Sequence, residues 1–88
     1  MNPLWRKLTD YSNKQVICNH YQDGALVGKD GIRFERIVLT GDSLVFYEDE
    51  AVKMRIAISR YPDIEQLHDF SNHYALSGPD DRLELYFV

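Results

Sequence analysis

The sequence predicts a mostly β fold, α+β by count. A short N-terminal helix would precede a five- to seven-stranded antiparallel meander that is strongly curled or closed into a small barrel. Two stretches carry this prediction. Residues 37–46 place two apolar runs around Gly41-Asp42, a pattern typical of a β-hairpin. Residues 52–59 alternate apolar and polar side chains, which indicates a strand with one buried face. The apolar side chains of that strand are Val52, Met54, Ile56 and Ile58.

The helix is expected to begin at Asn2-Pro3, because Asn is a favoured N-cap and Pro fits the first helical position. Asn13 is the expected C-cap. The apolar face of this helix would comprise Leu4, Trp5, Leu8 and Tyr11. About ten residues do not hold a helix alone in water, so this face is expected to pack against the sheet.

Three strands are expected next, at residues 14–21, 25–27 and 32–39. The inward face of the third strand switches between Phe34 and Ile37, which predicts a β-bulge or bend near Glu35-Arg36. Turns are expected at the glycine-containing stretches Asp23-Gly24, Gly28–Gly31 and Gly78–Asp81.

Pro62 is expected to end the strand pairing that precedes it, because proline has no backbone N–H to donate. Within residues 62–70, the spacing of Ile64, Leu67 and Phe70 fits a single helical turn or an irregular link. Residues 73–77 and 82–88 predict two final strands, the second with strict alternation. Short connections of this kind favour antiparallel neighbours.

The chain length and composition predict one domain, residues 1–88, because a chain this short builds one core but not two. A single cysteine, Cys18, allows no internal disulfide, which favours a reducing compartment and a cytoplasmic location. No stretch has the apolar length of a signal peptide or of a membrane span. The formal net charge of −4 disfavours nucleic acid as a partner.

No catalytic residue, metal ligand or cofactor site is predicted. Cys18 and His20 share a strand face, but no zinc-type spacing joins them to His68 or His73, so Cys18 is expected to be a buried small side chain. The adjacent carboxylates at Glu48–Glu50 and elsewhere fall in expected turns, where solvent keeps them ionised.

One group of residues has the composition of a binding surface. Basic and aromatic side chains on a sheet can bind single-stranded nucleic acid, and the candidates here are Lys53, Arg55, Arg33, Arg36 and Tyr47. The alternative is an ordinary exposed face with cross-strand ion pairs to Glu35 and Glu48, and we favour that alternative.

Two families of small barrels resemble parts of the chain. The strand rhythm of residues 36–46, 55–59 and 81–87 resembles that of PH/GRAM-type domains, although their usual C-terminal helix has no counterpart here. The order of elements from Asn2 to Ser59 is similar to that of Sm-like proteins, but Met54-Arg55 stands where an Sm-type RNA-binding pair is expected. Both resemblances imply a small curled sheet.

The expected function is a non-enzymatic module that binds a protein partner, or a second copy of itself, through an exposed strand edge and a tyrosine-rich face. The alternative is a nucleic-acid-binding small β-barrel of the Sm-like kind.

Overall fold

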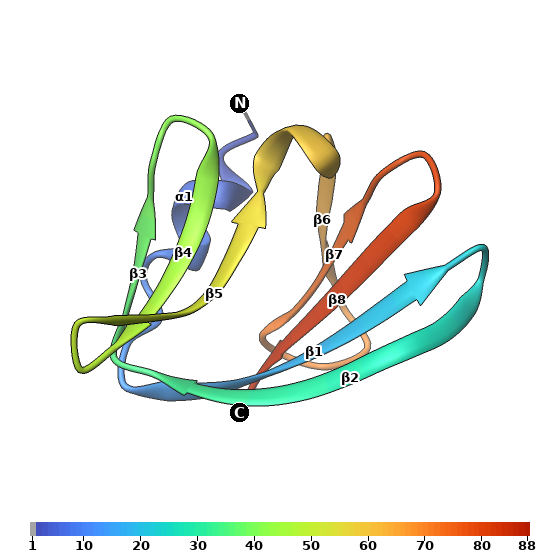
Figure 1. Cartoon of the computed structure of the whole chain (residues 1–88). Helices are drawn as coiled ribbons and strands as arrows, with labels where there is room; N and C mark the ends of the chain where they lie inside the picture. Colours follow the sequence, from blue (N-terminus) through green and yellow to red (C-terminus); the bar gives the residue numbers. More distant parts are fainter. Residues whose placement is uncertain (1) are drawn as a thin grey trace.

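The computed structural model describes residues 2–88, and it is mostly β (Figure 1). Within these residues it contains eight strands, one short α-helix and one 3₁₀ turn. In chain order they are α1 (Leu4–Leu8), β1 (Lys14–Gln22), β2 (Ala25–Phe34), β3 (Arg36–Leu39), β4 (Ser43–Glu48), β5 (Ala51–Ala57), η1 (Ile58–Arg60), β6 (Asp63–Leu67), β7 (His73–Ser77) and β8 (Asp81–Phe87).

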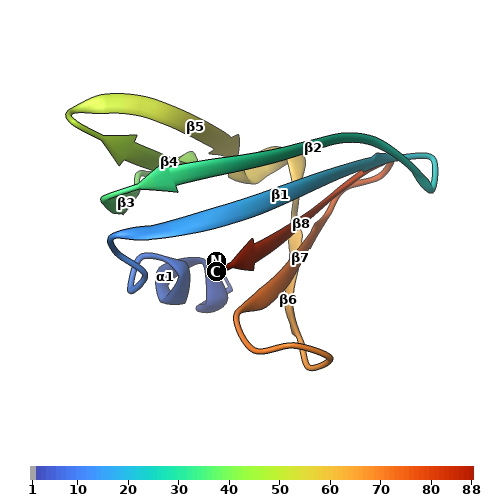
Figure 2. The same ribbon diagram turned by 90° about the horizontal axis from the view of Figure 1, so that it is seen from below.

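The strands form two antiparallel sheets rather than the predicted barrel. One sheet has five strands in the order β2-β1-β8-β7-β6, and the other has three in the order β3-β4-β5. Figures 1 and 2 show the three-stranded sheet set at an angle to the larger one. The barrel prediction was wrong because, among residues 2–88, no strand of one sheet pairs with a strand of the other. The helix α1 contacts β6 of the larger sheet and β3 of the smaller one.

The hydrophobic core lies between the two sheets and α1, with Phe87 near its centre. The Phe87 ring stacks on Tyr11 at a centroid distance of 4.0 Å and meets Phe34 and Tyr74 edge-on at 5.9 and 6.0 Å. It also lies 6.4 Å from Phe46 of the smaller sheet. Aromatic pairs of this geometry add to the free energy of burial, so this cluster ties the two sheets together.

Several local predictions are confirmed. The hairpin around Gly41-Asp42 is the β3–β4 pair, and the strands predicted at residues 14–21, 73–77 and 82–88 are β1, β7 and β8. The bend predicted at Glu35-Arg36 is the point at which the chain leaves one sheet and enters the other.

The helix is shorter than predicted, and Pro3, not Asn2, is its N-cap residue. The Leu4 backbone N–H donates to Asn2 Oδ1 at 2.9 Å. Trp5 and Leu8 are buried, and Leu4 and Tyr11 pack against the core. The helix already ends at Leu8, with Thr9 as its C-cap, so the prediction of Asn13 at that position was wrong.

Two segments differ from their predicted conformation. Gly28–Gly31 is not a turn but the middle of β2, because Gly28 pairs with His20 and Gly31 pairs with Ile17. Residues 63–67 are the strand β6, not a helical turn or an irregular link, because each of them pairs with a residue of β7.

The predicted inward face of residues 52–58 is only half right. Ile56 is buried, and Met54 packs against the core. A shift of register between Phe46 and Tyr47 then places Val52 opposite Tyr47, and its side chain is 49% exposed. Ile58 lies in η1, beyond the end of the strand, although it still contacts the core. A bulge of one residue turns the following side chains to the opposite face.

Candidate functional site

The five-stranded sheet has one face on the core and one face toward solvent. Alternation along each strand separates the two, so that in β1 Val16 and Cys18 are buried while Ile17 is partly exposed. Strand pairing aligns one row of side chains across the outer face, from Gly31 through Ile17, Tyr86 and His73 to Leu67. We call this set the apolar row. Phe70, which is 58% exposed, lies against the rings of Tyr86 and His73.

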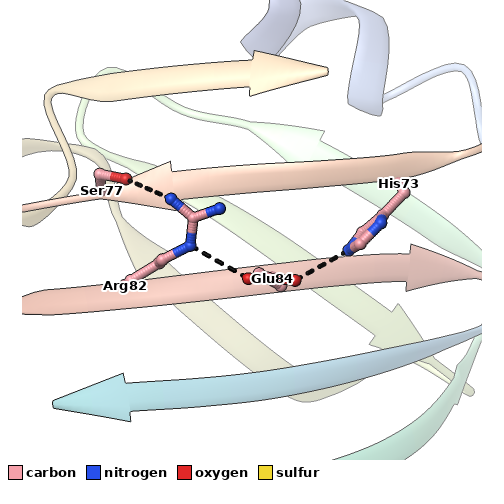
Figure 3. A network of polar contacts seen from close by, with 4 residues as sticks. All are labelled: His73, Ser77, Arg82 and Glu84. Carbon is pink, nitrogen blue, oxygen red and sulfur yellow. Dashed lines mark hydrogen bonds and ion pairs between the residues drawn. The ribbon is translucent and has the colours of Figure 1, made fainter. Parts of the chain in front are cut away.

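A polar network on β7 and β8 includes His73 of the apolar row (Figure 3). Arg82 Nε donates to Glu84 Oε2 at 3.0 Å, and His73 Nε2 lies 3.0 Å from Glu84 Oε1. The Arg82 guanidinium also donates to Ser77 Oγ at 3.5 Å. Both oxygens of the carboxylate are therefore engaged, and the network orders this face instead of offering a free general base.

A shallow hollow of about 410 Å³ lies at the other end of the same face. Its walls are the β1–β2 turn, at Asp23-Gly24, and the β7–β8 turn, at Gly78–Asp81, with Tyr21 and Arg82 between them. Four of its lining residues are acidic, and Arg82 is the basic one.

A second polar cluster links Asp81, on the inner face of the five-stranded sheet, to Arg60 of η1, which follows the three-stranded sheet. Arg60, at the end of η1, donates through Nε to Asp81 Oδ2 at 2.7 Å and also pairs through Nη2. His20 Nε2 lies 3.7 Å from the other oxygen of Asp81. The hydrogen bonds from Arg60 lower the pKa of the Asp81 carboxyl, and Asp81 raises the pKa of Arg60.

Cys18 lines a smaller hollow of about 280 Å³ between the sheets, together with Leu83, Tyr61 and residues of β5. Burial, and secondarily the charge of Asp30, raises the pKa of its thiol to about 11. A thiol with such a pKa is protonated at neutral pH and is therefore a poor nucleophile. This places Cys18 in the core, as its sequence context predicted.

The outer edges of the sheets differ in how they are covered. β3 and β6 both contact α1, and Asn2 Nδ2 donates to the Ile64 carbonyl of β6 at 3.3 Å. β2 pairs with β1 on one side, and among residues 2–88 no other segment makes a backbone hydrogen bond to residues 25–34. The end of β2 nearest the β1–β2 turn extends beyond the smaller sheet in Figures 1 and 2.

The structure separates the basic residues that were predicted as a binding group. Arg36 lies over the Tyr47 ring at 4.3 Å, and both residues share the outer face of the three-stranded sheet with Arg55. Arg33 lies instead on β2, in the other sheet, opposite Gln15.

Carboxylates accompany two members of this group. Lys53 pairs with Glu48 at 3.8 Å, and Arg36 pairs with Glu50 at 3.7 Å. The predicted ion pair to Glu48 is thus present, whereas Glu35 accepts a hydrogen bond from the Asp49 backbone N–H at 2.5 Å. Nucleic-acid binding by Lys53, Arg55, Arg33, Arg36 and Tyr47 stays a prediction.

The position of β2 at an open edge is the feature that sequence reasoning missed. Its central glycines resembled a turn, which hid a strand of ten residues. The Arg60–Asp81 pair was also missed, because no local pattern connects residues 21 positions apart.

In the part of the chain that the structure describes, no three His, Cys, Asp or Glu side chains are grouped so that they could hold a metal ion. None of its helices has the length and apolar character needed to cross a bilayer. No protein-family model matches the chain, and searches of curated proteins and of solved structures found no significant match.

Proposed function

We propose that this protein is a non-enzymatic interaction module that accepts an additional β-strand from a protein partner along β2. The observation that carries the proposal is the open edge of this strand. β2 is the longest of the eight strands, with ten residues, and it pairs on one side only. Leu26 and Val27 in it are each 54% exposed.

An open edge strand presents unpaired N–H and C=O groups that can pair with an added strand. Many proteins block such an edge with proline, a very short strand or a covering helix. β2 has no proline, is long, and lies away from α1, and the smaller sheet contacts it through β4 and β5 without adding a strand to it. Its charged residues, Lys29, Asp30 and Arg33, do not close the edge but restrict which strands can pair with it.

The other open edge is less suitable for pairing. β5 has seven residues, and Lys53 and Arg55 are both exposed on it. β2 also carries one lysine and one arginine, so the two edges differ in strand length, with ten residues open to pairing on β2 and seven on β5. The β2 edge therefore supports the proposal better than the β5 edge does.

The test is a selection of peptides from a random displayed library with the intact protein as bait. A Leu26→Lys/Val27→Lys variant is the counter-selection bait, and Val52→Lys, at an exposed position of β5, is the matched control. We expect peptides that bind the wild type and the control but not the β2 variant. Amide hydrogen exchange of β2 is expected to slow when they bind. Selected peptides that protect another segment, or no selected peptides at all, would overturn the proposal.

A further inference from the structure

The apolar row is incomplete at β2. On β1, β8, β7 and β6 the row consists of Ile17, Tyr86, His73 and Leu67, but on β2 it ends at Gly31. Ile17 is partly exposed beside this glycine. The row therefore stops one strand short of the sheet edge, with an apolar side chain bordering the gap.

Nothing inside the molecule requires glycine at that position. Gly31 does not have a positive φ, so its backbone suits any residue. A Cβ added to it would meet only the flexible end of the Gln15 side chain, at 3.4 Å, and a Cβ on Gly28 would meet the His20 Cβ at 3.8 Å. Glycine within a strand commonly marks a place that another chain approaches closely.

An added strand would place one of its residues directly opposite Gly31. Because Gly31 has no side chain, a bulky apolar group at that position can lie over the glycine and reach Ile17. It would thereby extend the apolar row by one strand, which is how large side chains stabilise glycine in a neighbouring strand.

The charges on either side of Gly31 specify what flanks this bulky residue. Lys29 and Arg33 each lie two positions from Gly31, so they share its face of the sheet, and both are exposed. The residues opposite them in an antiparallel partner lie two positions before and after the bulky residue. Acidic side chains there would pair with Lys29 and Arg33, whereas basic ones would repel them.

A second copy of this chain is a poor occupant. Two copies of β2 related by a two-fold axis pair residues on the same face. The two registers with the longest overlap are centred on residues 29 and 30, and they oppose Lys29 to Lys29 or Asp30 to Asp30. A register centred on Gly31 opposes Lys29 to Arg33. Like charges directly opposite each other are destabilising.

The remaining register of useful length is centred on Gly28, and it is disturbed by the local geometry. It would use the segment around Val27, where the pairing of β2 with β1 shifts register. A bulge of this kind twists a strand away from regular pairing.

We propose, on the basis of the function proposed above, that β2 binds an extended segment of a different protein in which a bulky apolar residue is flanked two positions away on each side by acidic residues. The bulky side chain covers Gly31 and contacts Ile17. The two carboxylates pair with Lys29 and Arg33.

The probe is a synthetic peptide, Thr-Glu-Val-Phe-Val-Glu-Thr, capped at both ends. Its matched controls replace both glutamates with lysine, or the phenylalanine with serine. Binding to the isotope-labelled protein is followed by amide chemical shifts at low salt. We expect the acidic peptide to shift the β2 amides and to bind about tenfold or more tightly than the lysine peptide.

Two sets of protein variants test the preference for acidic residues and the preference for a bulky apolar residue separately. Lys29→Glu/Arg33→Glu is expected to reverse the preference between the acidic and the lysine peptide, whereas Lys53→Glu/Arg55→Glu on the other sheet leaves it unchanged. Gly31→Val fills the gap from within the protein. It is therefore expected to reduce the preference for phenylalanine over serine while the charge preference persists.

The outcomes distinguish this inference from the proposed function. Library-selected peptides that protect β2 but show no preference for acidic residues would overturn the inference and leave the proposed function standing. An unchanged charge preference in Lys29→Glu/Arg33→Glu would do the same. Shifts confined to other strands, or no shift at millimolar peptide together with no β2-directed peptide from the library, would overturn both.

Discussion

Replacing Gly31 with alanine is expected to stabilise the free protein, although glycine is often retained for structural reasons. The position has an ordinary φ, and the added Cβ meets only the Gln15 side chain, at 3.4 Å. Alanine restricts the unfolded chain more than glycine does, so the folded state loses less entropy. Gly24 is the opposite case, because its φ is +82° in the β1–β2 turn.

The two substitutions are expected to change the free energy of unfolding in opposite directions. Gly31→Ala should raise the free energy of unfolding by about 0.4–1 kcal/mol, which corresponds to a rise in Tm of roughly 2–8 °C for a domain of this size. Gly24→Ala should lower the free energy of unfolding by about 1–2 kcal/mol, because alanine is strained at positive φ. Thermal melts followed by circular dichroism, with urea titrations at one temperature, measure both.

The comparison bears directly on the binding inference. A Gly31→Ala variant that loses as much stability as Gly24→Ala would mean that the fold itself requires glycine at residue 31. The gap in the apolar row would then have an internal cause, and the reason to expect an external side chain over it would disappear. Unchanged two-dimensional amide spectra are the control for a preserved fold.

The other predictions concern the core and the ionisable groups. Phe87→Ala should cost about 3–5 kcal/mol of unfolding free energy in urea titrations; a cost no larger than that of Phe70→Ala, at a 58% exposed ring, would contradict the central place of Phe87. Asp81→Asn should lower Tm at neutral pH, because it removes the carboxylate that accepts hydrogen bonds from Arg60. The pKa of Asp81 is lowered in the fold, so its contribution is complete above about pH 4 and is lost as the pH falls through the folded pKa; acid melts of the wild type and Asp81→Asn should converge there, and curves that stay parallel would refute the assignment. The pKa of Cys18 is raised from 9.0 to about 11, so the fold favours the protonated thiol and stability should fall as the pH rises through that interval; Cys18→Ala should lack this alkaline decline, and an equal decline in both proteins would contradict it.

The sequence was informative where a strand's own alternation reports its buried face. In β8, Leu83, Leu85 and Phe87 alternate with polar side chains and are all buried in the core. Such a pattern is local, and it requires no knowledge of the neighbouring strands. β1 was located instead by the β-forming residues at its centre.

The sequence was misleading where a strand is defined by its partner. Gly28-Lys29-Asp30-Gly31 has the composition of a turn, but β1 pairs with every one of these residues. β6 likewise has only one buried apolar residue, Ile64, and its conformation follows from pairing with β7. Pairing with a neighbouring strand leaves little trace in the composition of a strand that has few buried side chains of its own.

The candidate site was harder to predict than the fold. Asp81 was expected in a solvated turn, and Arg60, which it binds, is contributed by a different element. The significance of Lys29 and Arg33 depends on β2 being at the margin of its sheet, and strand order cannot be obtained from periodicity. The sequence analysis predicted that an exposed strand edge would be present, but it did not predict that this edge would be β2.

The order of strands in the larger sheet has a consequence for synthesis of the chain. β8 is the one strand that joins the β1–β2 hairpin to the β6–β7 hairpin. Until residues 81–87 have been translated, the two hairpins cannot join into one sheet. Val16 of β1 and Tyr74 of β7 then lack β8, the strand with which both of them pair. The five-stranded sheet is therefore expected to form only after β8 has been synthesised. Folding is then governed by long-range closure, which is slow compared with the formation of a hairpin.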